Sequence, residues 1–477
     1  MTADADTSWG AMFSQGRALA AITLASGVGL QAMEAFIVST LLPSVVGDIG
    51  GLELFAWNTT VFIVASIVAS IFAAVRPFGL GPRGTYMLAA AGFGIGSLIC
   101  GLAPNMETML AGRVVQGLGA GLLTAVGYNM IRLIFPQRLW GRAFALISTV
   151  WGVCTVVGPA VGGIFGNFDA WRLAFFVLVP CAVVLAVLAL KVIPKSSGEA
   201  GLSSVPVLQI VLILGAVTAM SVASVLTEGV LVASLLIVAA LLAIVAVAVL
   251  DSRRSARLFP TGTFSRAGTL AALFAAMILL NSAIVSDIFV PLFLQELHGQ
   301  SPLVAGYLLA LTAVGWSAGS ILVSTWTGAR ERIVLTLGPV LQLAGLAGLA
   351  LFIGRNNAAG DILPLVPVAI GLLLLGTGIG IAWPHISARV LAAAPAGEGD
   401  LTSASISMVQ LFASGFGAAV AGVIVNAAGL AGGSAPGTIA AANWLYALFA
   451  LAPLVAIPLL WSIARTERAS MAAQPAE

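Results

Sequence analysis

The sequence predicts an all-α integral membrane protein with fourteen membrane-spanning helices. Of its 477 residues, 60% are hydrophobic and only 8% are charged, and the mean hydropathy is +1.10. A soluble protein carries about 25% charged residues, so this chain has too few to cover a surface exposed to water. The apolar residues lie in long continuous runs, which argues against the short alternating strands of a membrane β-barrel.

A helix needs about 20 apolar residues to cross the hydrocarbon core of a bilayer. The predicted spans are 18–43, 55–75, 84–104, 107–131, 143–165, 172–192, 205–226, 230–250, 267–295, 302–325, 332–353, 362–390, 403–427 and 440–463.

The distribution of basic residues supports this count. If the N-terminus is cytoplasmic, 17 of the 20 lysines and arginines fall in inner loops and tails. Arg172 and Arg355 then fall in outer loops, and Arg113 falls inside the fourth span. The positive-inside rule therefore supports the count and predicts that both termini are cytoplasmic. We expect the protein to lie in a bacterial inner membrane. The polar residues 1–16 and the long first run do not resemble a secretory signal peptide.

Two polar stretches, 191–204 and 251–266, divide the spans into groups of six, two and six. We expect a six-helix bundle over 1–192, an inserted helix pair with cytoplasmic linkers over 193–266, and a second six-helix bundle over 267–477. Repeated halves with a binding site near the bilayer midplane are a recurrent transporter design. The inserted pair has two interpretations, a lipid-facing spacer, which we favour, or a part of the transport path.

The first and fourth spans each contain a charged residue. Glu34 lies nine residues before Pro43, and the fourth span reads R-V-V-Q-G-L-G-A-G, with Arg113 and Gln116. At 1.5 Å per residue, Glu34 and Arg113 lie about 13 Å and about 9 Å from the outer end. Charges inside a membrane are costly and are normally paired or functional. Each charge is therefore either part of a structural ion pair or a group that takes part in function.

The fifth span contains the pattern G-x-x-x-x-x-G-P-x-x-G-G, formed by Gly152, Gly158, Pro159, Gly162 and Gly163. Proline kinks a helix, and glycines leave a bare face that another helix can approach closely. The pattern predicts a bent, tightly packed helix that can serve as a gating element, a simple packing face being the alternative.

The second half has its own candidates. Asp287 lies in the ninth span and is a second candidate to bind a proton or a cationic substrate. The alternative is that it pairs with a local group near the outer surface. His385 follows Trp383 in the twelfth span, where a lone histidine is either a packing residue or a titrating one.

The residues expected to line a substrate cavity are Gln31, Gln116, Asn129, Asn281, Trp383 and His385.

These motifs resemble those of the major facilitator superfamily. The glycine–proline pattern resembles the antiporter motif of its exporters, and R-V-V-Q-G resembles its second motif. L-Q-A-M-E-A-F-I-V-S-T-L-L-P resembles the first-helix signature of the drug:proton antiporters with fourteen helices, with Glu34 where that family usually has aspartate. The stretches that begin at Asp287 and at Gly399 also resemble this family. The resemblance implies a major facilitator fold, two six-helix bundles plus two inserted helices. In this superfamily the first and fourth helices line the cavity, which implies that Glu34 and Arg113 interact, either as a static salt bridge or as a pair in which Arg113 competes with a proton for the carboxylate.

The loop after the second span departs from this pattern. The superfamily usually has G-x-L-x-D-R-x-G-R-R there, but this chain has A-A-V-R-P-F-G-L-G-P-R-G, with Phe78 about where the aspartate belongs. Arg76, Gly81 and Arg83 keep the basic, turn-forming character of the loop. In the superfamily this loop helps to lock the cytoplasmic gate by charge pairing, so that account of gating does not transfer directly.

The residues and the resemblance predict a proton-coupled exporter of amphipathic or cationic small molecules that works by alternating access. Two alternatives stay open: an importer or uniporter of the same fold, and a membrane sensor or structural subunit without flux. We expect no enzyme activity, cofactor, metal or nucleic acid, because the chain has no G-x-x-x-x-G-K motif, no metal-ligand spacing and no basic aromatic patch. The expected partners are a small-molecule substrate, protons and membrane lipid, and a monomer is expected.

Overall fold

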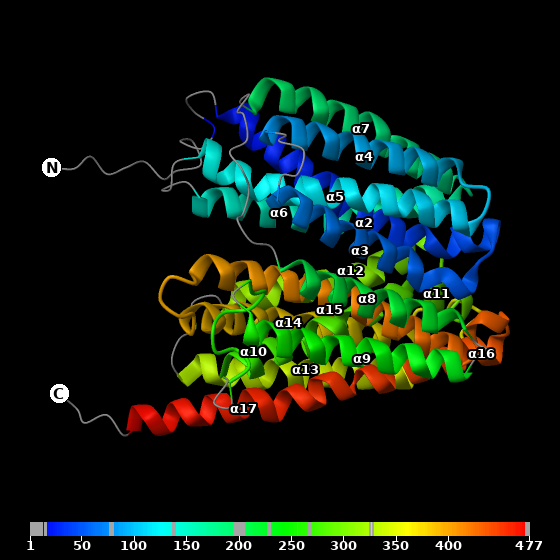
Figure 1. The fold of residues 1–477 in the computed structure, drawn as a ribbon. Helices are drawn as coiled ribbons and strands as arrows, with labels where there is room; N and C mark the ends of the chain where they lie inside the picture. The colour runs from blue at the N-terminus through cyan, green and yellow to red at the C-terminus, as the bar shows by residue number, and fades with distance from the viewer. Residues whose placement is uncertain are drawn as a thin grey trace. The chain divides into compact units, whose positions relative to one another are not determined.

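The computed structural model describes residue 13 and residues 17–75, 81–135, 140–193, 206–226, 230–254, 256–265, 269–323, 326 and 329–472. Within these ranges the chain is helical and contains no strand (Figure 1). The helices are α2 (Ala18–Ile49), α3 (Phe55–Val75), α4 (Pro82–Leu102), α5 (Met106–Ile134), α6 (Trp140–Asn167), α7 (Trp171–Val192), α8 (Val207–Val225), α9 (Val230–Arg253), α10 (Thr269–Val285), α11 (Val290–Glu296), α12 (Pro302–Val323), α13 (Ala329–Phe352), α14 (Leu365–Ala392), α15 (Gly399–Ala427), α16 (Ala435–Phe449) and α17 (Leu451–Ala472). Three short 3₁₀ turns are η1 (Leu52–Leu54), η3 (Ser286–Phe289) and η4 (Leu430–Gly432).

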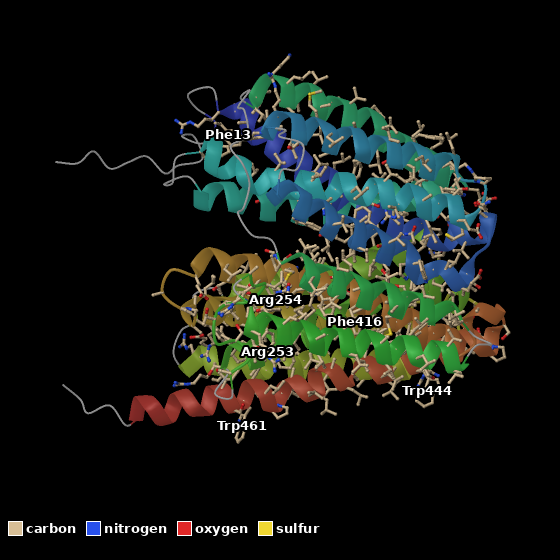
Figure 2. All side chains as sticks on the ribbon, in the orientation of Figure 1. Phe13, Arg253, Arg254, Phe416, Trp444 and Trp461 are labelled. Atoms are coloured by element: carbon tan, nitrogen blue, oxygen red, sulfur yellow. The ribbon has the colours of Figure 1, made fainter. Side chains whose placement is uncertain are left out.

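The helices cover the fourteen predicted spans, but two of these spans are each divided between two helices: the ninth, and the fourteenth, 440–463, which comprises α16 and α17. Among the described residues, 13 stretches are long and apolar enough to cross a membrane. The remaining span is α5, which is 29 residues long and packs against α2 and α4. Large apolar side chains on α9, such as Leu231 and Leu242, are mostly exposed, as are Trp444 and Trp461, which project from α16 and α17 in Figure 2. In a bilayer these side chains would contact lipid.

The ninth span differs from the single helix expected over 267–295. It is divided into α10, the 3₁₀ turn η3 and α11. Pro291 explains the break, because it has no N–H to donate to the carbonyl of Asp287 four residues earlier and its ring crowds that carbonyl. Instead, the N–H of Val290 bonds the Asp287 carbonyl in a tighter turn. Asp287 therefore lies within an interruption of the helix.

The chain forms two compact units. Unit 1 comprises Met1–Gly51, Val61–Ser203 and Ser301–Tyr307, and unit 2 comprises Leu52–Thr60, Ser204–Gln300 and Leu308–Glu477. The inserted helices α8 and α9 fall in unit 2, where α8 packs against α15. The helices α3 and α12 are each divided between the units.

In unit 1, glycines let α5 approach α3 until backbones touch. Gly117 lies against the backbone of Phe62, and Gly121 lies against the backbone of Ser66. A Cβ at either position would collide with α3, so only glycine allows this distance. The hydroxyl of Ser66 uses the proximity to donate to the carbonyl of Gly117 at 3.0 Å.

Unit 2 repeats this seam between α14 and α12. Gly376 lies against the backbone of Thr312, and Gly380 lies against the backbone of Trp316. Both seams use the outer glycines of a G-x-G-x-G sequence, at 117–121 in α5 and at 376–380 in α14, whereas the middle glycines, Gly119 and Gly378, lie against α4 and α13. The repeated spacing indicates that the two bundles are built on one plan, as expected for a transporter with repeated halves.

The loop between α9 and α10 is held to unit 2 by side-chain hydrogen bonds. The two carboxylate oxygens of Asp251 accept from the N–H groups of Leu258 at 2.5 Å and Phe259 at 3.1 Å. The hydroxyl of Ser405 on α15 donates to the carbonyl of Leu258 at 2.6 Å. These bonds fasten the inserted helix pair to the helices that follow it.

Candidate functional site

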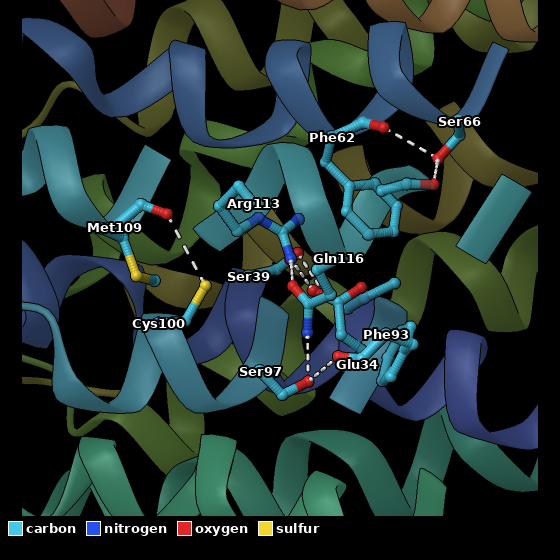
Figure 3. A network of polar contacts seen from close by, with 12 residues as sticks. Glu34, Ser39, Phe62, Ser66, Phe93, Ser97, Cys100, Met109, Arg113 and Gln116 are labelled. Atoms are coloured by element: carbon cyan, nitrogen blue, oxygen red, sulfur yellow. Dashed lines mark hydrogen bonds and ion pairs between the residues drawn. The ribbon is translucent and has the colours of Figure 1, made fainter. Parts of the chain in front are cut away.

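A buried ion pair joins α2 to α5 in unit 1 (Figure 3). Arg113 Nη1 donates to Oε1 of Glu34, and the two side chains are 4% and 0% exposed. The guanidinium also lies over the ring of Phe62 on α3, 4.2 Å from its centroid. Both interactions strengthen where water is excluded, so the pair is a strong local electrostatic feature of the membrane region.

Arg113 belongs to a chain of hydrogen bonds across three helices. Its Nη1 donates to Oε1 of Gln116 at 2.5 Å, and Nε2 of Gln116 donates to the hydroxyl of Ser97 on α4 at 2.9 Å. Gly96 makes this reach possible, because α4 lies so close to α5 that a Cβ there would collide with Gln116. The same nitrogen of Arg113 therefore donates to both Glu34 and Gln116, and the network links α2, α5 and α4.

One oxygen of Glu34 has no partner among the described residues. Its Oε2 is buried and makes no hydrogen bond, whereas Oε1 is bonded to Arg113. The unbonded oxygen is the atom to which a proton can add. Such a proton would remove the negative charge that faces Arg113 and so weaken the ion pair.

Gln31 lies one turn before Glu34 on the same helix. Its Oε1 accepts a hydrogen bond from the hydroxyl of Thr124 on α5 at 2.6 Å. Gln31 is partly exposed. Asn129 lies farther along α5, but its side chain falls outside the described residues.

The candidate residues on α10 and η3 have different surroundings. Asn281 is buried, and its Nδ2 donates to the Gln410 carbonyl at 3.1 Å and to the Ser414 hydroxyl at 2.9 Å, both on α15. Asp287 is partly exposed, and its carboxylate has no recorded hydrogen bond or ion pair within the described ranges. Asn281 therefore fastens two helices, whereas Asp287 has no countercharge comparable to Arg113.

The seam between α12 and α14 carries aromatic rings and unbonded polar atoms. The rings of Trp316 and Trp383 are inclined at 53°, with centroids 6.1 Å apart. His385 is 8% exposed, and neither its Nε2 nor the hydroxyl of Thr312 has a hydrogen-bond partner in the described part of the chain. Sequence reasoning selected Trp383 and His385 but missed Trp316, whose relevance depends on the glycine seam that places it beside Trp383.

The glycines of the α6 motif contact specific neighbours. A Cβ at Gly158 would lie 2.5 Å from the Cβ of Phe36, and one at Gly162 would lie 3.1 Å from the carbonyl oxygen of Ile37, both on α2. Gly163 lies against the backbone of Leu303 at the start of α12. Gly152 has no atom within 4 Å of such a Cβ.

Pro159 lies inside α6, and the predicted loop residues lie earlier in the chain, around the start of α4. Gly81 directly precedes α4, and Arg83 lies in its first turn. Arg76, expected to contribute to the same loop, lies outside the described residues, as does Phe78. No group of three or more histidine, cysteine, aspartate or glutamate side chains suited to a metal ion occurs among the residues the structure describes.

Known proteins resemble this chain over most of its length. The family model of the Major Facilitator Superfamily matches residues 24–418. A probable multidrug-efflux transporter of Mycobacterium tuberculosis is 38% identical over 446 residues, which cover 90% of each chain. A tetracenomycin C resistance and export protein of Streptomyces glaucescens is 28% identical over 374 residues, covering 75% of this chain and 68% of that protein. A crystal structure of a peptide transporter aligns with a TM-score of 0.65 at 14% identity, over 94% of this chain and 95% of the other, which shows a shared fold alone.

Proposed function

The chain belongs to the Major Facilitator Superfamily and is a membrane transporter, and from this premise we propose that it exports amphipathic or cationic small molecules in exchange for protons. The described efflux and export roles of the mycobacterial and Streptomyces relatives support the outward direction. The motif of α6, which resembles that of superfamily exporters, supports the same direction.

The observation that supports proton coupling concerns Glu34, which is buried beside Arg113. Its Oε2 makes no hydrogen bond to any described residue. An antiporter needs a group that holds a proton in one state and releases it in another. Arginine does not deprotonate in proteins, so Arg113 cannot be that group, but it can compete with the proton for the carboxylate of Glu34. A bound cationic substrate would also compete for the carboxylate of Glu34. The hydrogen bond to Gln116 keeps the guanidinium in place while the carboxylate is neutral.

The substrate contacts proposed here combine apolar and polar groups. The Trp316–Trp383 pair offers aromatic faces for a lipophilic body or a cation, and Gln31 offers an amide next to the proton site. Asp287, whose carboxylate forms no ion pair among the described residues, would attract a positively charged group. Apolar surfaces with a few polar groups are typical of small-molecule sites and suit a broad substrate range.

Replacing Glu34 by glutamine tests the proton site. The purified protein is reconstituted in vesicles, with the lipophilic cation ethidium as the probe, and accumulation is measured with and without an imposed pH gradient. The Glu34→Gln variant is permanently neutral at this position, so it should lose gradient-driven accumulation but retain ethidium counterflow. The Asp287→Asn variant should accumulate ethidium less well, because it lacks a carboxylate that attracts the cation, but its remaining accumulation should still depend on the pH gradient.

Proton release on addition of ethidium, measured at several pH values, separates the alternatives. Wild-type protein and Asp287→Asn should release protons, and Glu34→Gln should not. Release that persists in Glu34→Gln and disappears in Asp287→Asn would move the coupling site to the second half. Ethidium flux that ignores the pH gradient in the wild type would instead indicate a uniporter.

A further inference from the structure

The helix α3 belongs to both units of the structure. Residues 52–60, which include η1 and the start of α3, cluster with unit 2, and the rest of α3 clusters with unit 1. The sequence of α3, Phe55–Val75, contains neither glycine nor proline. Proline and glycine are common causes of sharp helix bends, and α3 runs without interruption from Phe55 to Val75, so we treat it as a stiff rod at the point where its surroundings change.

An inserted helix holds the start of α3. Nε1 of Trp57 donates to the Ser221 carbonyl at 2.8 Å and to the Ser224 hydroxyl at 3.3 Å, both on α8. The Ser224 hydroxyl in turn donates to the Ser221 carbonyl at 2.7 Å. Both serines are buried, so these bonds are shielded from competing water.

A second helix adds to this attachment. Nδ2 of Asn426 on α15 donates to the Glu53 carbonyl at 2.8 Å and to the Ser224 carbonyl at 3.0 Å. Gly422, one turn earlier on α15, lies against the side chains of Ala56 and Ser224. We call the bonds of Trp57 and Asn426 to Glu53, Ser221 and Ser224 the α3 latch.

The remainder of α3 is fixed equally firmly to unit 1. Gly117 and Gly121 of α5 lie against its backbone, and the Ser66 hydroxyl donates to the Gly117 carbonyl. The helix α12 is also divided between the units, after Tyr307, but Gly306 directly precedes that division. Bending at Gly306 is available to α12, whereas α3 has no such residue.

We propose that the inserted helix α8 serves as the anchor of the α3 latch, and that each transport cycle releases and re-forms this latch. The proposal rests on the proposed function, because only alternating access requires the two bundles to move against each other. A rigid α3 transmits that movement to its first residues, and the hydrogen bonds of the latch are the contacts that give way. The inserted pair then has a mechanical role in transport rather than that of a spacer.

Labelling of a buried cysteine tests the latch without any substrate. In a background lacking Cys100, Cys154 and Cys181, Ala56→Cys places a thiol at a position that is 2% exposed. Trp57→Phe keeps an aromatic ring but removes the N–H donor, so it should speed the reaction of that thiol with a small, charged methanethiosulfonate severalfold.

Two control variants accompany this measurement. Ser221→Ala removes a buried hydroxyl that bonds nothing in the described part of the chain, and Trp444→Phe makes the same change as Trp57→Phe on an exposed surface. Neither should alter the labelling rate. An unchanged rate in Trp57→Phe, or an equal increase in the controls, would overturn the proposal even if ethidium were not transported.

Reversible cross-linking tests whether the latch must open for transport to occur. A Cβ at Gly422 would lie 2.9 Å from that of Ala56 and 3.3 Å from that of Ser224, close to the separation of about 3.5–4.5 Å found in disulfides. Oxidising the pair Ala56→Cys/Gly422→Cys ties α3 to α15 and should stop ethidium transport until the disulfide is reduced. The matched pair Ser282→Cys/Gly417→Cys, where a Cβ at Gly417 would lie 3.2 Å from that of Ser282, ties α10 to α15 outside the latch and should leave transport intact. Transport that survives oxidation of the first pair would show that the latch stays closed during the cycle and would overturn the proposal.

Discussion

At the scale of single residues, Glu34 and Glu398 are stabilised in different ways. Glu34 is buried and depends on Arg113, so truncating the arginine would leave an uncompensated charge at a cost of about 3–5 kcal/mol. Glu398 lies outside the membrane spans, where it accepts hydrogen bonds from the N–H of Thr261 at 2.6 Å and from the hydroxyl of the same residue. The carboxylate of Glu34 can therefore gain and lose a proton, whereas that of Glu398 holds the loop between α9 and α10 in place.

The hydrogen bonds from Thr261 make Glu398 a source of acid sensitivity. They hold the pKa of Glu398 below its ordinary value of 4.5, because they favour the ionised carboxylate. The folded pKa lies below the unfolded one, so this contribution to stability is complete above pH 4.5 and is lost as the pH falls through the folded pKa. We expect Thr261→Val to lower the melting temperature at pH 7 and to reduce the further loss between pH 5 and about pH 3. Melting curves in detergent check this, and parallel pH profiles for the two proteins would contradict it.

The partners of Arg113 show which contacts a sequence can predict. Glu34 was predictable, because two membrane charges of opposite sign at similar depths are each costly alone. Ser97 and Phe62 were not, because a single serine or phenylalanine in an apolar run is ordinary. Their roles depend on how closely α3 and α4 approach α5, which is a property of the packed bundle.

At the scale of helices, α6 offers a test in which one motif contains its own control. Gly158→Leu and Gly162→Leu would force a bulky side chain against α2, where even a Cβ is crowded. Both variants should insert normally but lose transport of ethidium. Gly152→Leu belongs to the same motif but meets open space, so it should keep transport. Immunoblots of membranes establish insertion, and normal flux in the first two variants would reduce the motif to an incidental packing face.

The broken ninth span marks a limit of prediction from sequence at this scale. Pro43 and Pro291 both lie in long apolar runs, yet α2 continues through Pro43 to Ile49 whereas the helix before Pro291 is interrupted. The difference lies in the surroundings of the carbonyls. The hydroxyl of Tyr446 on α16 lies 3.4 Å from the Ser286 carbonyl and donates to it, which helps to satisfy the interrupted backbone. A partner 160 residues away is invisible to a local pattern.

At the scale of the whole molecule, hydropathy predicted the number of helices well because lipid imposes one simple rule on every span. The grouping of helices follows no such rule. The polar stretches at 191–204 and 251–266 predict a separate inserted segment, and in the structure α8 and α9 fall in one compact unit with the helices that follow. The bond from Asn426 on α15 to Ser224 on α8 is one contact within this unit, and its two residues lie far apart in the sequence.

The orientation of the chain in the membrane remains a prediction from the basic residues, and two cysteines can test it. Seven spans, from α8 to α15, separate position 196 from Gly433, so an odd number of crossings places these positions on opposite sides. Because inner loops and tails would hold 17 of the 20 basic residues, Gly433→Cys should react with an impermeant thiol reagent on intact cells. Ser196→Cys, in the cysteine-free background, should react only in inside-out vesicles. Reaction of both cysteines on intact cells would mean a miscounted span. If instead only Ser196→Cys reacted on intact cells, the fourteen helices would stand but their direction in the membrane would be reversed. The α3 latch would then open on the other side of the membrane.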